Sequence, residues 1–264
     1  MKQLAHRLSV VLSVACLGSV AVATGCSSSP ASPSDGSTGT GGSAVTETGT
    51  LLTPDATGWV DRGATATTGI QGAWYGYGDM TDCTAAGHPA SACSVIVQPP
   101  LMGFPQTVPG SMCTNGTAAV VPTPTQADYS AVWGAGIALD LNAEGGDAAA
   151  NAPKTPYDAT ANGVLGFSFD IDVAPPLSGM RVEFPTPTTS NAAAYWGGGG
   201  AANSPVKKGH NVILWAMVGG PSYITNPPVF TPSMINSIQF HIPTNTTAPV
   251  TYSFCISNLK ALTN

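Results

Sequence analysis

The sequence predicts an all-β protein, an antiparallel β-sandwich, and three observations support this fold class. Apolar and polar residues alternate in short runs; in one of them Phe167, Phe169 and Ile171 share one side while Ser168 and Asp170 share the other. No segment holds a long helical period. The 31 glycines and 23 prolines divide the chain into short pieces, as turns between strands do. A jelly roll is the antiparallel sandwich that fits this pattern.

Alternation places the individual strands along the chain. We expect strands at residues 117–121, 136–142, 163–173, 180–184, 211–217, 237–242 and 251–259. If the strands at 163–173, 180–184, 211–217 and 237–242 share one sheet, its outer face gathers polar side chains. These are Asp170, Asp172, Arg181, Glu183, Gln239 and His241. Trp215 joins them if its side of the 211–217 strand faces outward. The alternative is a solvated face on which Arg181 pairs with Asp170 or Glu183.

Aromatic residues in glycine-rich surroundings supply a second set of candidate ligand-binding residues. Trp74, Tyr75 and Tyr77 cluster in one stretch, and Tyr195 and Trp196 precede four glycines. Aromatic rings stack on the C–H faces of sugars, while nearby polar side chains bind the hydroxyl groups. The alternative for each ring is packing in the core or at a sheet edge.

The N-terminus has the pattern of an export signal with a lipid attachment site. Lys2 and Arg7 precede an apolar run over residues 8–22, and residues 23–25 lead directly into Cys26. The run is too short to span a bilayer. It resembles the lipobox of bacterial lipoproteins, whose mature chain begins with a diacylated cysteine. The alternative is an ordinary signal peptide cleaved near Ala23, with Cys26 incidental.

Composition then divides the chain into three parts. Residues 1–25 form the signal peptide, residues 26–47 a lipidated cysteine with a flexible Ser/Gly/Pro linker, and residues 48–264 one β-sandwich domain. The resemblance implies a protein anchored by acyl chains such as palmitate in the cell envelope. Ser27 after the cysteine is compatible with the outer membrane.

Charge excludes two classes of partner. From Cys26 onward the chain holds fourteen acidic and six basic residues, a net charge of about −8. Without a basic stripe, nucleic acid is not an expected partner. The membrane is contacted through the lipid anchor alone.

Four cysteines remain after Cys16 in the signal and Cys26 at the anchor. An even number in an exported chain indicates disulfides. Three pairings are possible, and we favour Cys83–Cys93 with Cys113–Cys255, a short loop and a long closure. The spacing matches no zinc motif.

Several segments together carry a family resemblance. They are residues 58–61, 69–75, 133–142, 157–160, 163–169, 181–184 and 252–259. Their order resembles galactose-binding-like jelly rolls, including carbohydrate-binding modules of bacterial glycanases and lipoproteins of myxobacterial type. The resemblance implies a carbohydrate ligand and, in many members, a structural calcium held by a carboxylate in the last strand. Residues 256–259 read Ile-Ser-Asn-Leu there, so the expected cofactor set is none, with calcium as the open possibility.

No residue pattern indicates catalysis. Asp170 and Asp172 are spaced almost as in an inverting glycosidase, but nothing in the sequence raises the pKa of either. Nucleophile-elbow, zinc-protease and phosphate-loop motifs are absent. We therefore expect a lipid-anchored, non-catalytic glycan-binding protein of the envelope. The alternatives are a structural or adhesive envelope protein with a protein partner, and a glycan-degrading enzyme.

Overall fold

The computed structural model describes residues 47–98, 111–121, 129–144, 154–172, 179–187, 197–198, 206–220, 226 and 229–264. All of them belong to one compact unit, Val45–Asn264. The predicted signal peptide, Cys26 and nearly all of the linker lie outside the described residues, as do Tyr195 and Trp196. None of the helices in the described ranges is both long and apolar enough to cross a bilayer.

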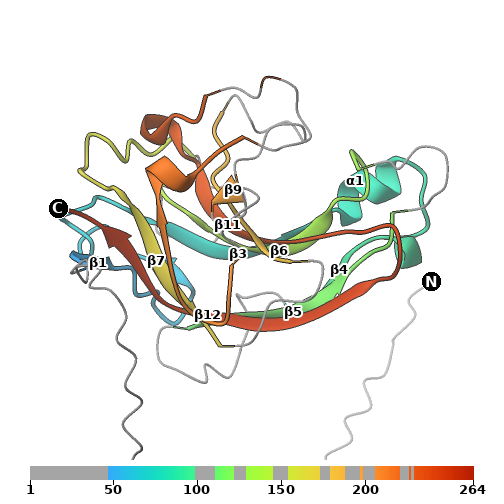
Figure 1. Cartoon of the computed structure of the whole chain (residues 1–264). Helices are drawn as coiled ribbons and strands as arrows, with labels where there is room; N and C mark the ends of the chain where they lie inside the picture. The colour runs from blue at the N-terminus through green and yellow to red at the C-terminus, as the bar shows by residue number, and fades with distance from the viewer. Residues whose placement is uncertain are drawn as a thin grey trace, which may run out of the picture. The chain divides into compact units, whose positions relative to one another are not determined.

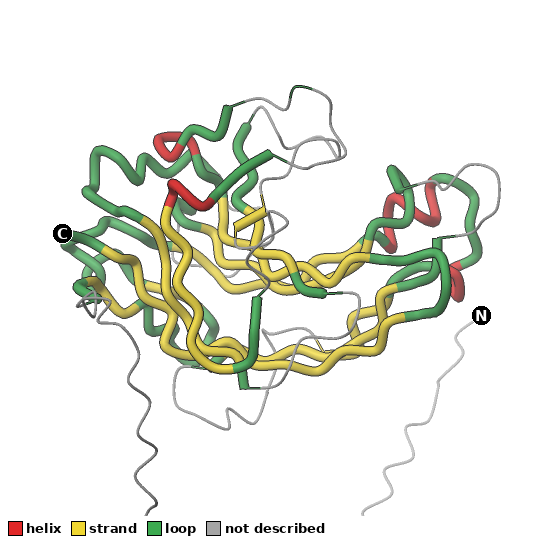
Figure 2. Tube along the Cα trace, in the orientation of Figure 1, coloured by secondary structure: helices red, strands yellow, loops and turns green. Residues whose placement is uncertain are grey.

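The described residues form two antiparallel sheets stacked face to face, which confirms the predicted β-sandwich (Figures 1 and 2). The first sheet has the order β10-β7-β12-β5-β4, with β1 pairing to β12. Its strands are β1 (Gly49–Leu51), β4 (Val95–Gln98), β5 (Met112–Ala118), β7 (Gly166–Ile171), β10 (Gly209–Leu214) and β12 (Val250–Leu262). The second sheet has the order β2-β3-β6-β11-β8-β9. Its strands are β2 (Trp59–Val60), β3 (Gly72–Gly78), β6 (Gly134–Asp140), β8 (Arg181–Glu183), β9 (Gly197–Gly198) and β11 (Ser237–Pro243).

Helical turns in the described residues are short and lie outside the two sheets (Figure 2). They are α1 (Met80–Ala85) and the 3-10 turns η1 (Ala90–Ala92), η2 (Trp215–Met217) and η3 (Pro232–Met234). The strand expected over residues 211–217 is therefore wrong at its end, because the chain leaves β10 after Leu214 and closes the η2 turn.

The connections explain why the fold is a jelly roll. From β5 onward the chain crosses repeatedly between the sheets, so that β6 and β11 lie in one sheet while β7 and β12 lie in the other. Each crossing separates strands that are neighbours in sequence and pairs strands that are distant. The four strands expected to share a sheet are consequently divided. β7 and β10 pair with each other in the first sheet, and β8 and β11 pair in the second.

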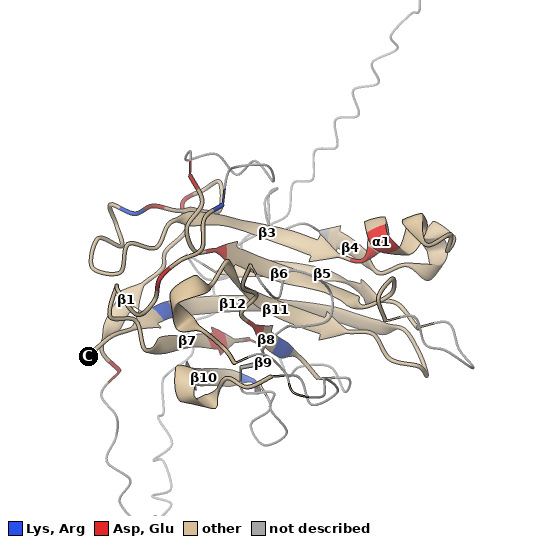
Figure 3. Cartoon of the chain, turned by 90° about the horizontal axis from the view of Figure 1, so that it is seen from above, with Lys and Arg blue, Asp and Glu red and all other residues tan. Residues whose placement is uncertain are grey.

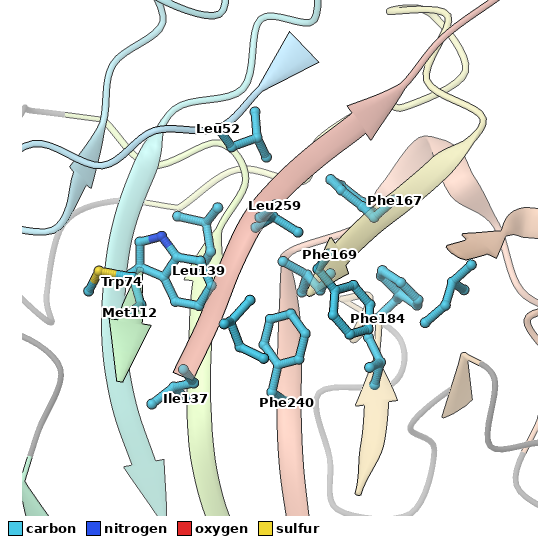
Figure 4. Close-up of a cluster of buried hydrophobic side chains, with 14 of the residues drawn as sticks. Leu52, Trp74, Met112, Ile137, Leu139, Phe167, Phe169, Phe184, Phe240 and Leu259 are labelled. Carbon is cyan, nitrogen blue, oxygen red and sulfur yellow. The ribbon is translucent and has the colours of Figure 1, made fainter. Parts of the chain in front are cut away.

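The core lies between the inner faces of the two sheets (Figure 4). Phe240 of β11 stacks on Trp74 of β3 at a centroid distance of 6.0 Å and meets Phe169 of β7 edge to face at 5.0 Å. A fully buried aromatic side chain contributes about 2–3 kcal/mol. Trp74, at 1% exposed, is thus a core residue, and its proposed role in ligand contact is wrong. Because neighbouring residues alternate, burying Trp74 turns Tyr75 to the outer face.

Both disulfides form the predicted pairs. Cys83–Cys93 links α1 to the residue after η1, and Cys113–Cys255 joins directly opposite positions of β5 and β12. The second bridge fixes the last long strand to the centre of the first sheet.

Candidate functional site

The outer face of the β3-β6-β11-β8 sheet gathers the polar residues that the sequence placed outward on β8 and β11. We call it the outer polar face. Two rows of side chains cross it: Tyr75, Ala138, Gln239 and Glu183, then Tyr77, Gly136, His241 and Arg181. β6 contributes only small residues to these rows. The tyrosines of β3 lean over them, and the ring of Tyr77 lies 6.0 Å from that of His241 on the far side of β6.

A cavity of about 670 Å³ opens on one end of this face. Its lining residues are Tyr75, Asp140, Lys154, Pro156, Pro185, Pro187, Met234, Asn236, Ser237 and Gln239. The mixture of one aromatic ring, prolines, two amides and one ion pair is typical of small-molecule sites, which combine apolar walls with a few convergent polar groups.

An ion pair and an aromatic ring form one wall of the cavity. Lys154 Nζ lies 2.8 Å from Asp140 Oδ2 and 4.6 Å from the centroid of the Tyr75 ring. Burial raises the pKa of the Asp140 carboxyl above its ordinary value, although Lys154 and Tyr75 act in the opposite direction. Burial, reinforced by Asp140, also raises the pKa of the Tyr75 hydroxyl. The hydroxyl therefore stays protonated and able to donate.

Gln239 lies in the floor of the cavity, at the centre of the sheet. Its side chain is directed outward because Ile238 and Phe240 on either side are buried in the core. Gln239 Nε2 donates to Ser237 Oγ at 3.3 Å. Gln239 Oε1 is buried and has no hydrogen-bond partner among the residues that the structure describes.

Arg181, Glu183 and His241 form a cluster next to the cavity, in which Glu183 and His241 are buried and Arg181 is partly exposed. Arg181 Nε lies 3.2 Å from Glu183 Oε1, and His241 Nε2 donates to the Trp133 carbonyl oxygen at 3.1 Å. His241 Nδ1 lies 3.1 Å from both Arg181 Nη2 and Glu183 Oε1. Burial raises the pKa of Glu183, but His241 and Arg181 outweigh it and hold that pKa below its ordinary value. β8 carries both the acidic Glu183 and the basic Arg181 of this cluster; acidic residues are red and basic residues blue in Figure 3.

The contacts of His241 with the protein leave neither of its ring nitrogens available for proton transfer to a ligand. Both of its ring nitrogens contact groups of the protein itself, and the side chain is only 3% exposed. A general acid or base needs a nitrogen within reach of a substrate. This geometry suits a role of His241 in fixing the positions of Arg181 and Glu183.

Trp133 extends the aromatic surface beyond the cavity. Its ring stacks on Tyr77 at 5.9 Å, and Tyr77 lies 6.3 Å from Tyr75. The backbone N–H groups of Trp133 and Gly134 donate to Asp79 Oδ2 at 2.9 and 2.8 Å. Asp79 is fully buried, so this carboxylate fixes the start of β6 and with it the indole of Trp133.

Gly134 is required where it stands. Its φ is +129°, and a Cβ there would lie 2.2 Å from the Ile242 carbonyl oxygen and 2.7 Å from His241 Nε2. Glycine therefore allows β6 to approach β11 closely at the edge of the outer polar face.

Trp215, a predicted site residue, lies outside the outer polar face. Ile213 is buried, so the 211–213 side of β10 faces inward, and the partly buried Trp215 packs against the core residues Phe167 and Phe184. Trp215 also donates from Nε1 to the Val164 carbonyl oxygen at 2.6 Å. The expectation that Trp215 forms an open stacking platform is wrong for this reason.

Asp170 lies on the first sheet, away from Arg181, Gln239 and His241. It pairs with His210 of the adjacent strand, with 2.8 Å between Asp170 Oδ1 and His210 Nδ1. Asp172 accepts from the Cys255 backbone N–H at 2.8 Å. The single outer face expected to hold all six polar residues is therefore divided between two sheets.

Sequence reasoning missed three residues as site residues: Trp133, Asp140 and Lys154. Tyr77 was named with Tyr75, and the two share one side of β3. Asp140 falls in the strand expected over residues 136–142 and ends β6. Its pairing with Lys154, fourteen residues later in the chain, leaves no sequence signal.

Among the described residues, no three His, Cys, Asp or Glu side chains converge to hold a metal ion.

Comparison with known proteins adds two solved structures. The family 11 carbohydrate-binding module of a cellulosomal cellulase of Clostridium thermocellum is 11% identical; the match covers 65% of this chain and 95% of the module, with a TM-score of 0.30. A solution structure of CtCBM11 is 12% identical over 61% of this chain and 93% of its own, with a TM-score of 0.25. No protein-family model and no curated protein matches the chain. The description of the fold rests on the two sheets and their register.

Proposed function

We propose that this chain is a non-catalytic, lipid-anchored protein of the cell envelope whose β-sandwich head binds carbohydrate through the outer polar face. The observation that carries the proposal is the cavity in which the Tyr75 ring, the Gln239 amide and the Lys154–Asp140 pair converge. Sugars need such a combination of an aromatic face and directed polar groups.

Two further features support a binding role. The aromatic surface continues from Tyr75 through Tyr77 to Trp133 with ring spacings near 6 Å, which suits a chain of sugar units. His241 is held by the protein at both ring nitrogens, which supports binding rather than acid–base catalysis. The anchor is supported by the sequence at Cys26, and the outer membrane by Ser27 after it.

The test is a glycan-array screen of the purified full-length chain in detergent, with its disulfides formed, with and without calcium. We expect binding to one polysaccharide class with millimolar to micromolar affinity. Tyr75→Ala should weaken that binding at least tenfold, because stacking on the ring is lost. Trp215→Phe, which alters a partly buried ring packed against the core, is the matched control and should keep wild-type affinity.

The outcome decides between the two classes of function. Silence of the folded wild-type chain on every glycan contradicts the proposal and directs the search to a protein partner in the envelope. Incorporation of labelled palmitate into the wild type but not into Cys26→Ser tests the anchor separately.

A further inference from the structure

Gln239 presents a buried acceptor that the fold itself leaves unused. Buried polar atoms are nearly always hydrogen-bonded, so each exception needs an explanation. Gln239 is 9% exposed and lines the cavity, and its Oε1 has no partner in the described part of the chain. The other end of the same amide is occupied, since Nε2 donates to Ser237 Oγ.

The orientation of this amide is fixed by the sheet. Gln239 is paired in register with Ala138 on one side and Glu183 on the other, so its backbone is held by both neighbouring strands. Ala138 is too small to reach the amide from β6, and the Tyr75 side chain of β3 approaches the Gln239 side chain across it. The Gln239 side chain lines the cavity, and its Oε1 is the buried acceptor that has no hydrogen-bond partner among the described residues.

The charges around the cavity define the group that this oxygen suits. Lys154 and Asp140 neutralise each other at 2.8 Å, and Arg181 lies 3.2 Å from Glu183. A further cation would gain no unpaired carboxylate from the described lining of the cavity. An uncharged donor, the hydroxyl group of a sugar, would meet an acceptor oxygen that makes no hydrogen bond to the described residues.

We propose that Gln239 is the specificity-determining residue of the cavity and that its Oε1 accepts a hydrogen bond from one sugar hydroxyl of the bound glycan. This inference rests on the proposed function of the outer polar face. Gln239 determines specificity by contacting the ligand directly, and Ser237 fixes the orientation of the Gln239 amide.

The proposal predicts opposite effects on stability and on binding. Gln239→Met has a similar length and shape but no acceptor. The free protein loses an unsatisfied buried oxygen, so its melting temperature should stay the same or rise. Affinity for the glycan identified on the array should fall about tenfold or more, because the ligand hydroxyl loses its partner.

Asn211 supplies the matched control. It is also a buried amide, but every polar atom of it is used: Oδ1 accepts from the Lys207 N–H, and Nδ2 donates to the carbonyl oxygens of Lys207 and Gly209. Asn211→Leu should lower the melting temperature and leave the affinity unchanged.

The experiment measures both quantities on the full-length chain, by differential scanning calorimetry and by isothermal titration with the glycan. Binding by the wild type with equal affinity in Gln239→Met overturns the role of Gln239 and leaves the proposed function intact. A marked fall in the melting temperature of Gln239→Met overturns it too, since the amide would then serve the fold. Absence of binding by the wild type contradicts the proposed function itself.

Discussion

His210 on the first sheet lies between the carboxylates of Glu47 and Asp170, and this group of three residues, called the histidine clasp below, predicts how the stability of the fold depends on pH. His210 Nε2 lies 2.7 Å from Glu47 Oε1, and His210 Nδ1 lies 2.8 Å from Asp170 Oδ1. A neutral imidazole carries one N–H and can donate to only one carboxylate, so both contacts require the protonated ring. Asn258 donates to the other oxygen of Asp170 at 2.7 Å, and the Lys260 ammonium faces both carboxylates.

The direction of each pKa shift defines the pH range in which the clasp contributes. Hydrogen bonds to Glu47 and then to Asp170 raise the pKa of His210 above 6.5, so its contribution is complete below that pH and lost as pH rises through the folded-state pKa. Burial raises the pKa of each carboxyl, but their partners outweigh it, and the pKa values of Glu47 and Asp170 are lowered. Their contribution is present above about pH 4.5, the ordinary value of the glutamate, and lost as pH falls through the folded-state values. The clasp is complete between these limits.

The expected magnitude is modest because the groups are largely solvent-exposed. The His210 side chain is 50% exposed, and exposed ion pairs contribute at most about 1 kcal/mol. For a domain of this size, about 1 kcal/mol corresponds to roughly 2–4 °C in melting temperature. We therefore expect the melting temperature to fall by about that amount between pH 6 and pH 8.5, beyond the change seen in Glu47→Gln.

The assay combines calorimetry at the two pH values with an NMR titration of the His210 Hε1 resonance. In Glu47→Gln the pKa of His210 should decrease toward 6.5, because one of its two carboxylate partners is neutral. His88→Gln is the matched control, since no carboxylate of the described residues pairs with His88. Equal pH dependence of wild type and Glu47→Gln would refute the clasp.

Two further predictions concern the core and the disulfides. Replacing Cys113 and Cys255 by alanine should lower the free energy of unfolding by up to about 5 kcal/mol, because that bridge joins residues 142 apart. Replacing Cys83 and Cys93 should lower it by about 3 kcal/mol, because that bridge joins residues 10 apart. Urea unfolding measures both losses, and equal losses would contradict the loop-length argument. Trp215→Ala should cost up to about 3 kcal/mol in the same assay, because the partly buried ring packs against the core, and should leave glycan affinity unchanged; a loss of affinity at full stability would show that Trp215 contacts the ligand.

The sequence located the strands that carry a clear alternation, because that pattern is local, whereas β3 and β4 were not expected as strands. Alternation identified Arg181, Glu183, Gln239 and His241 as outward residues, and they do share one face of one sheet. The even number of cysteines and their spacing favoured the pairing that the structure has.

Sheet membership could not be predicted from alternation. β7 and β11 have the same pattern of inward apolar and outward polar residues, because both sheets turn their apolar faces to one core. Nothing local distinguishes them, so Asp170 was grouped with His241 although the chain crosses between the sheets. Alternation also could not decide which of Trp74 and Tyr75 faces the core, since either orientation of β3 puts one of the two aromatic rings inward.

The outer polar face shows a pattern of burial that stability alone does not explain. Asp140, Glu183, Gln239 and His241 are all at most 9% exposed, yet they lie on the side of the sheet that faces away from the core. Burying ionisable groups costs free energy even when they are paired, and apolar residues of similar volume would be as stable or more so. The described residues in and beside the cavity include two ion pairs and one amide oxygen that has no described partner. Local rules of stability are broken mainly at functional sites, and here they are broken together, next to a tyrosine ring, on one face. That coincidence supports the proposal that a ligand binds over this face of the sheet, where residues of the connecting segments, such as Lys154, Pro185 and Asn236, complete the cavity.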